Sequence, residues 1–169
     1  MSLFRISLVP VVVWLILAEG DAAHYWAAGL FVIAASTDAL DGYLARRHAM
    51  TTRTGAWLDP LSDKLLVGAP IVVLATQGEF PWWAGVIIVG REVAVSLLRV
   101  YLGSRRASMP ASLTGKAKAV LQMTAITLYL LPGVPELIRV AVLVVAVAFT
   151  IWSGVEYFMK ARALVRAER

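Results

Sequence analysis

The sequence Asp38-Ala-Leu-Asp41-Gly-Tyr-Leu-Ala-Arg46 is followed, after eight residues, by Gly55-Ala-Trp-Leu-Asp59-Pro-Leu-Ser-Asp63. Two pairs of aspartates therefore lie close together in an otherwise apolar chain. The first pair is spaced i,i+3 and the second i,i+4, so on helices the members of each pair share one face. Carboxylates at membrane depth are energetically costly and usually have a function. These four aspartates are the first candidates for chemistry.

The composition is that of a membrane protein. Of the 169 residues, 60% are hydrophobic and 16% are charged, whereas soluble domains are about a quarter charged. The mean hydropathy is +0.76. The net charge is +5, but the charges fall at the ends of apolar segments, which argues against a nucleic-acid partner. Because the chain has no cysteine, disulfides and thiolate metal sites are excluded.

Six apolar segments approach the ~20 residues that a bilayer crossing needs. The first resembles a signal peptide, but it lacks a convincing cleavage site and further apolar segments follow, so we predict that it is retained. With no internal repeat or linker, residues 1–169 are predicted to form one domain. The sequence thus predicts an all-α integral membrane protein with six transmembrane helices, at about residues 5–19, 24–47, 54–76, 81–102, 113–132 and 136–160.

The charges between the segments predict the orientation. Loops on one side are acidic, and the loops and chain ends on the other side are rich in Lys and Arg. By the positive-inside rule, both termini are predicted to be cytoplasmic, in the inner (plasma) membrane. The basic side, which also favours anionic lipid head groups, carries Arg5, Arg46, Arg47, Arg53, Arg105, Arg106, Lys116, Lys118, Lys160, Arg162, Arg166 and Arg169.

The aspartate pairs are predicted to meet near the cytoplasmic surface. With a rise of ~1.5 Å per residue, Asp41 and Asp38 lie about 9 and 13 Å before the end of the second segment. By the same rise, Asp59 and Asp63 lie about 8 and 13 Å into the third. In an antiparallel hairpin Asp41 would therefore face Asp59, and Asp38 would face Asp63.

Four clustered carboxylates repel one another unless cations bind them or some are protonated. Oxygen ligands without Cys or His suit Mg²⁺ or Mn²⁺. The alternative is that each aspartate only forms an ion pair with a nearby Arg or Lys. This interpretation is the weaker one because the two aspartate pairs are predicted to lie at the same depth. The small residues Gly42, Ala45 and Gly55 permit close approach of the two helices or of a ligand, although such residues are also ordinary packing positions.

The fourth segment carries a polar stripe of Glu92, Ser96 and Arg99 at i, i+4 and i+7. The nearby cations could bind an anionic substrate beside the metal site; they are Arg91, Arg99, Arg105, Arg106, Lys116 and Lys118. The alternative is internal pairing of Arg91 or Arg99 with Glu92, with the loop charges setting topology.

No chemistry is predicted on the sixth segment, whose uncharged apolar part would suit a homodimer face. The aromatic residues near segment ends are predicted to form an interfacial belt; they include Trp26, Trp82, Trp83, Trp152 and Tyr157.

Residues 38–63 match the signature Asp-x2-Asp-Gly-x2-Ala-Arg-x8-Gly-x3-Asp-x3-Asp without a gap or substitution. The chain therefore resembles the CDP-alcohol phosphotransferases. Asp59-Pro60-Leu-Ser-Asp63-Lys64 is similar to the variant in family members that make phosphatidylglycerophosphate and in their cardiolipin-synthesising relatives. The regions Gly90-Arg91-Glu92 to Arg99 and Gly115-Lys116-Ala117-Lys118 to Gln122 also resemble those members.

The resemblance implies transfer of a phosphatidyl group from CDP-diacylglycerol to glycerol 3-phosphate, with release of CMP. It implies that Asp38, Asp41, Asp59 and Asp63 hold two divalent ions and that Asp63 also accepts the proton of the attacking hydroxyl. Gly42, Arg46 and Thr52 match positions that contact the CDP-lipid, and Ala45 and Gly55 lie beside them. The implied partners are CDP-diacylglycerol, a phosphorylated alcohol and membrane lipids.

Other functions are weighed against this one. The same chemistry could use phosphatidylglycerol or an inositol phosphate as acceptor, although the Asp-Pro-x-x-Asp-Lys form disfavours the latter. Intramembrane prenyltransferases also have Asp-rich motifs, but with more spans and different spacing. A divalent-cation transporter would need acidic residues leading to the far side, and among the deep positions of segments four to six only Glu92 is acidic.

The N-terminus departs from the family pattern. The family has an amphipathic segment that ends in a Leu-Thr-x-x-Arg-like sequence, and this chain begins within it at Ser2-Leu3-Phe4-Arg5. Either the start is misassigned or truncated, or this member lacks the segment.

Overall fold

The computed structural model describes the backbone of residues 2–48, 55–104 and 113–167, and the side chains of these residues except 2–5, 38–48, 55–63, 104, 113, 165 and 167. Over these ranges the secondary structure is helical. The six helices are α1 (Ser2–Leu17), α2 (Asp21–His48), α3 (Gly55–Thr76), α4 (Trp82–Ser104), α5 (Leu113–Leu130) and α6 (Glu136–Ala167). The predicted all-α architecture with six helices is confirmed.

The helix boundaries follow local sequence signals. Gly20, Gly78 and Gly133 have φ angles of 99°, 80° and 75°, a left-handed conformation that glycine adopts without steric cost. Each of these glycines lies one or two residues after the end of a predicted apolar segment. The largest difference from the predicted ranges is in α6, which continues to Ala167. Its last residues are mostly Ala, Arg, Leu and Lys, which are strong helix formers, so the basic tail extends the helix.

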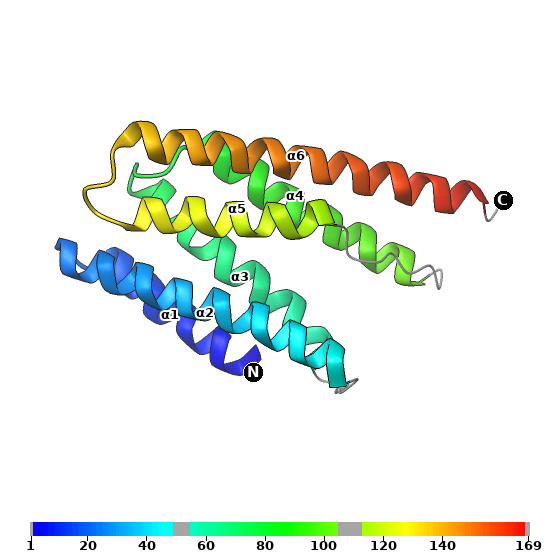
Figure 1. The fold of residues 1–169 in the computed structure, drawn as a ribbon, viewed down its shortest axis with the longest axis horizontal. Helices are drawn as coiled ribbons and strands as arrows, with labels where there is room; N and C mark the ends of the chain where they lie inside the picture. The colour runs from blue at the N-terminus through cyan, green and yellow to red at the C-terminus, as the bar shows by residue number, and fades with distance from the viewer. Residues whose placement is uncertain (1, 49–54, 105–112, 168–169) are drawn as a thin grey trace.

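The helices alternate in direction along one bundle (Figure 1). The C-terminal ends of α2, α4 and α6 and the N-terminal ends of α1, α3 and α5 lie toward the same end, which we call the motif end because the aspartate motif lies there. The opposite end, formed by loops 18–20, 77–81 and 131–135, is called the far end. The N- and C-terminal regions therefore both approach the motif end.

The bundle consists of two groups of three helices. In the first group α1 packs along both α2 and α3, and in the second α6 packs along both α4 and α5. Smaller contacts of α2 and α3 with α5, and of α3 with α4, join the two groups. In Figure 1, α1 and α2 lie in the lower part and α5 and α6 in the upper part, and α3 runs from the lower part up behind α5.

The core is apolar toward the far end and polar toward the motif end. Large buried side chains come from successive helices, including Phe31, Ile71, Ile88, Ile126 and Leu143. Among the side chains that the structure describes, the buried polar ones are Lys118, Gln122, Thr150 and Ser153, on α5 and α6. A buried polar layer needs internal partners, and those partners define the site described below.

In the part of the chain that the structure describes, one helix passes a test of length and apolar composition for crossing a membrane. Glu136–Leu164 is long and apolar enough to cross a bilayer, whereas Ile6–Leu17 and Lys64–Thr76 are shorter apolar stretches. The other helices carry charges within their length, such as Arg91 and Glu92 on α4 and Lys118 on α5, which lower their hydropathy. The number of spans and their orientation therefore stay predictions.

Candidate active site

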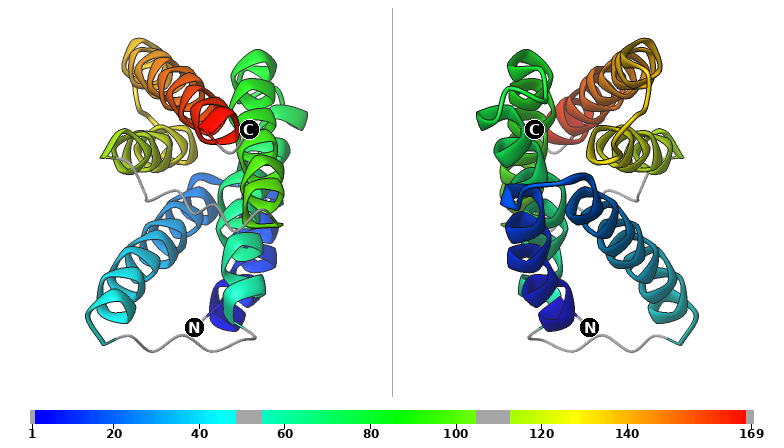
Figure 2. Two further views of the ribbon diagram at one scale, coloured as in Figure 1. Left: turned by 90° about the vertical axis from the view of Figure 1, so that its right-hand side faces the viewer. Right: turned by 90° about the vertical axis from the view of Figure 1, so that its left-hand side faces the viewer.

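The aspartate motif lies on α2 and α3 at the motif end. Asp38 and Asp41 are about 15 and 10 Å before the end of α2 along its axis, and Asp59 and Asp63 are about 6 and 12 Å into α3. The side chains of all four lie outside the described residues. In both views of Figure 2 the C-terminal end of α2 and the N-terminal end of α3 lie on opposite sides of the lower part of the bundle.

The described side chains do not test the prediction that Asp41 faces Asp59 and Asp38 faces Asp63. No group of three or more His, Cys, Asp or Glu among those side chains could hold a metal ion. The prediction of a divalent-ion site therefore rests on the type of ligand in the motif, because carboxylate oxygens suit hard divalent cations.

The predicted CDP-lipid contacts also lie at the motif end. Gly42, Ala45 and Arg46 are on the last turns of α2, and Gly55 is the first residue of α3. Thr52 lies outside the described residues, as do the side chains of the other four. Their contacts therefore stay predictions.

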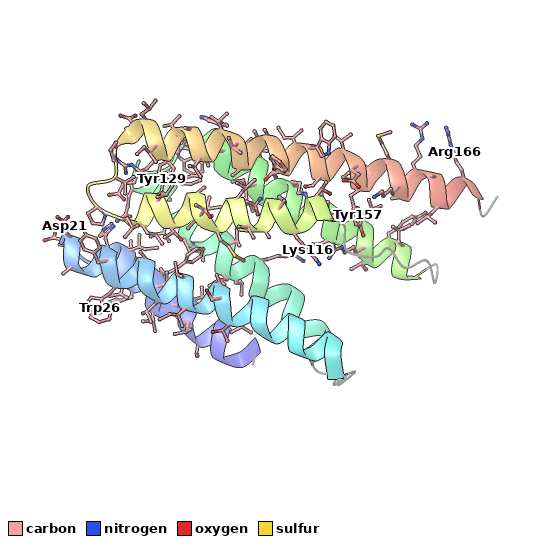
Figure 3. All side chains as sticks on the ribbon, viewed as in Figure 1. Asp21, Trp26, Lys116, Tyr129, Tyr157 and Arg166 are labelled. Carbon is pink, nitrogen blue, oxygen red and sulfur yellow. The ribbon has the colours of Figure 1, made fainter. Side chains whose placement is uncertain are left out.

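Four of the predicted acceptor-binding cations are described: Arg91 and Arg99 on α4, and Lys116 and Lys118 on α5. Arg105 and Arg106 lie outside the described residues. Lys116 is exposed, and Figure 3 shows it, like Tyr157, on the motif-end half of the bundle. The other three cations take part in a polar network between α4, α5 and α6.

Glu92 is the shared anion of this network. Its Oε1 accepts hydrogen bonds from Lys118 Nζ and from Arg91 Nη1, the latter at 3.3 Å. The side chains of Arg91, Glu92 and Lys118 are 14%, 23% and 8% exposed. The predicted alternative of an Arg91–Glu92 pair is thus confirmed, and Lys118 is a second partner that the sequence did not predict.

Arg91 also reaches across to α6. Its Nη2 donates a hydrogen bond to Ser153 Oγ at 3.1 Å. A Cβ atom added at Gly154 would lie 3.3 Å from Arg91 Cγ, so the absence of a side chain there leaves room for the arginine. Among the described residues, no partner is found for the buried Nε of Arg91.

Arg99 is held by Tyr157. Its Nε donates to the Tyr157 hydroxyl at 3.2 Å, and its guanidinium carbon lies 5.3 Å from the centre of the ring. Tyr157 is only 8% exposed, so its predicted place in an interfacial belt is wrong. Trp26, Trp82, Trp83 and Trp152 are all more than half exposed, as such a belt requires.

Two further polar contacts flank the cations. Toward the motif end, Thr114 donates to Glu156 Oε2 at 2.6 Å, and Lys160 donates to the other carboxylate oxygen of Glu156. Deeper in the bundle, Gln122 Nε2 donates to Thr150 Oγ1 at 2.8 Å. Through these contacts, Thr150 and Glu156 of α6 have hydrogen-bond partners on α5.

The network has more positive than negative charge. Arg91 and Lys118 pair with the carboxylate of Glu92, and Lys118 interacts electrostatically with both Arg91 and Arg99. Together the four side chains carry a net charge of +2. Partly buried cations are costly without an opposite charge. An anion with two negative charges would balance this cluster, and arginine is well suited to bind phosphate.

Sequence reasoning missed the contribution of α6. Ser153 and Tyr157 of this helix carry no charge but accept hydrogen bonds from Arg91 and Arg99, and the prediction that the sixth segment carries no chemistry stays untested. A signal was present, since Thr150, Ser153 and Tyr157 are spaced i, i+3 and i+7 on an otherwise apolar helix and share one face.

A separate cavity lies at the far end. Its volume is about 660 Å³, and its lining includes Asp21, Glu79, Tyr129, Glu136 and Arg139. Figure 3 shows Asp21 and Tyr129 at that end, away from Lys116 and Tyr157. The cavity contains none of the predicted site residues.

Comparison with known proteins gives a consistent result. Residues 1–152 match the family described as CDP-alcohol phosphatidyltransferase. The chain is 38% identical to a probable phosphatidylglycerophosphate synthase of Mycobacterium tuberculosis, over 95% of this chain and 79% of the relative.

Two further relatives carry the name CDP-diacylglycerol–glycerol-3-phosphate 3-phosphatidyltransferase. The relative from Bacillus subtilis is 39% identical, over 94% of this chain and 91% of its own length. The relative from Escherichia coli is 37% identical, over 96% of this chain and 93% of its own length.

Proposed function

The chain belongs to the CDP-alcohol phosphatidyltransferase family, and we propose that it transfers the phosphatidyl group of CDP-diacylglycerol to glycerol 3-phosphate in phospholipid biosynthesis. The products are phosphatidylglycerophosphate and CMP. The observation that carries this proposal is the complete four-aspartate signature in residues 38–63, within a chain whose relatives are named for this reaction.

The motif residues bind the donor. Asp38, Asp41, Asp59 and Asp63 supply oxygen ligands only, which fits two Mg²⁺ or Mn²⁺ ions. When bound, such ions neutralise the charge of the diphosphate. Gly42 and Gly55 let the donor approach the helix backbone closely, and Ala45, Arg46 and Thr52 contact the CDP-lipid.

In the reaction, a hydroxyl oxygen of glycerol 3-phosphate forms a bond to the phosphorus that carries the diacylglycerol. The bond from that phosphorus to the bridging oxygen breaks, and CMP leaves with the electron pair. Asp63 accepts the hydroxyl proton. Because phosphoryl transfer depends mainly on positioning and charge stabilisation, a carboxylate is a sufficient base.

The α4–α5–α6 cations bind the acceptor. The phosphate of glycerol 3-phosphate carries close to two negative charges, which match the net charge of +2 that Arg91, Arg99 and Lys118 carry together with Glu92. Lys116 on α5 adds positive charge, and we assign the same role to Arg105 and Arg106, which follow α4 in the sequence. Phosphatidylglycerol and inositol phosphate are the alternative acceptors, but the names of the relatives favour glycerol 3-phosphate.

The site faces the cytoplasm in this proposal. The basic residues cluster at the motif end and both chain termini approach it (Figure 1), which is the arrangement of a multi-pass protein of the inner (plasma) membrane with cytoplasmic termini. The donor's acyl chains then stay in lipid while the water-soluble acceptor reaches the polar network.

The test is CMP release by the purified full chain in detergent with CDP-diacylglycerol and Mg²⁺. Glycerol 3-phosphate, phosphatidylglycerol and inositol phosphate are supplied in separate reactions. Release with glycerol 3-phosphate alone is expected. Release with only one of the other acceptors would overturn the acceptor assignment, and no release by a folded protein would overturn the proposed reaction.

A further inference from the structure

One face of α6 is built differently from the rest of the helix. Thr150, Ser153, Gly154, Tyr157 and Ala161 are all buried and face the bundle. The neighbouring residues Trp152, Val155, Phe158 and Met159 point outward and are 69%, 53%, 47% and 68% exposed. The inward face therefore joins small residues, hydroxyl groups and one tyrosine, and it lies against α4 and α5.

This face fixes the side chain of Arg99. Arg99 is an exposed residue, whereas Tyr157 beneath it is buried. The ring lies under the guanidinium, and the hydroxyl accepts its Nε–H. The Tyr157 hydroxyl bonds Nε and not the terminal Nη groups of Arg99, and we take those Nη groups as the donors for a ligand.

The same face fixes Arg91 one turn earlier. Ser153 accepts from Nη2, and Gly154 leaves space for the aliphatic part of the side chain. Glu92 holds Nη1 from the α4 side. Arg91 is therefore fixed from two helices, about 12 Å before Arg99 along the axis of α4.

We propose that α6 positions the acceptor-binding arginines, with Tyr157 acting on Arg99 and Ser153 and Gly154 acting on Arg91. The inference rests on the proposed acceptor site. A free arginine side chain loses rotamer entropy when it binds a phosphate, and pre-ordering it reduces that cost. Tyr157 is thus a positioning residue that sets the affinity for the phosphorylated acceptor, and it contacts no reacting atom.

The main experiment compares Tyr157→Phe with Val155→Ala, a matched change on the outward face of the same helix. Tyr157→Phe keeps the ring and removes the hydroxyl. A hydrogen bond to a charged group corresponds to an affinity change of roughly tenfold, so the KM for glycerol 3-phosphate should rise by roughly threefold to tenfold. The KM for CDP-diacylglycerol should stay unchanged, and Val155→Ala should change neither KM.

A double-mutant cycle tests whether Tyr157 acts through Arg99. Arg99→Lys keeps the charge but loses the planar guanidinium and its Nε–H. If Tyr157 acts through Arg99, adding Tyr157→Phe to Arg99→Lys should have little further effect on the KM for the acceptor. Additive effects of the two changes would overturn the positioning role. Gly154→Ala should also raise the KM for the acceptor, because the new Cβ displaces Arg91.

A binding measurement separates this inference from the proposed function. Inorganic phosphate and glycerol 3-phosphate should each protect the parent protein against thermal unfolding in detergent, with Tyr157→Phe needing several times more ligand. If the parent releases no CMP but phosphate protection weakens in Tyr157→Phe, the positioning of an anion stands and the proposed reaction fails. If the parent is active and Tyr157→Phe behaves as Val155→Ala does in both assays, the positioning fails and the reaction stands.

Discussion

Replacing Glu92 with glutamine tests the charge balance of the polar network. The change keeps the shape of the side chain and removes the carboxylate that holds Arg91 and Lys118. Breaking a fully buried ion pair costs about 3–5 kcal/mol because the remaining charge is uncompensated. Glu92 is 23% exposed and Lys118 is 8% exposed, and glutamine still offers an acceptor oxygen, so the expected loss is about 2–3 kcal/mol.

Thermal unfolding of the purified protein in detergent measures this loss. For a chain of this length, the expected fall in Tm is roughly 5–10 °C. The control is Glu156→Gln on α6, whose partners are Lys160, which is 56% exposed, and Thr114, whose hydrogen bond the glutamine oxygen can still accept. Exposed ion pairs contribute little to stability, so the control should lower the Tm much less.

A second variant identifies the cause. If the loss comes from an uncompensated buried cation, adding Lys118→Met to Glu92→Gln should recover most of the Tm, because an apolar side chain of similar length replaces the buried ammonium. The double variant should still bind glycerol 3-phosphate poorly. A Glu92→Gln protein with the same Tm as Glu156→Gln, or a double variant less stable than Glu92→Gln, would refute this reasoning.

The remaining predictions concern the donor site, the acceptor site and a turn. Asp63→Asn should abolish CMP release while the Tm stays near that of the parent; near-parental activity would contradict the role of Asp63 as base. Removing divalent ions with a chelator should stop CMP release and Mg²⁺ should restore it, whereas activity in the chelator would contradict the metal assignment. Arg91→Lys should raise the KM for glycerol 3-phosphate by roughly tenfold, since lysine lacks the guanidinium fork; an unchanged KM would remove Arg91 from the acceptor site. Gly133→Ala should cost about 1–2 kcal/mol, because a Cβ is strained at its φ of 75°, and it should lower the Tm without changing either KM.

The sequence predicted the helices well because its strongest signals are local. Gly20, Gly78 and Gly133 mark the far-end turns, and the apolar runs between them are long enough to define each helix. The C-terminal extension of α6 was missed because the sixth segment was defined by its apolar residues and ended at residue 160, although the Ala and Arg residues that follow also favour helix.

The polar network could be predicted only in part. Arg91 and Glu92 are adjacent in sequence, so their pairing was foreseen. Ser153 lies 62 residues after Arg91 and Tyr157 lies 58 residues after Arg99, and spacing along the chain does not reveal which faces of distant helices meet. Tyr157 was assigned to the interface because tyrosine near a segment end is typical of that position, whereas packing of α6 against α4 buries it.

The two groups of helices divide the work of the proposed reaction between them. The donor motif lies on α2 and α3 of the first group, and the acceptor-binding cations lie on α4 and α5, braced by α6, in the second. Changes within the second group can therefore alter which alcohol is accepted while the aspartates that act on the CDP-lipid stay intact. A hybrid chain that joins residues 1–76 to the last three helices of a relative with another acceptor would exchange the alcohol and keep the release of CMP.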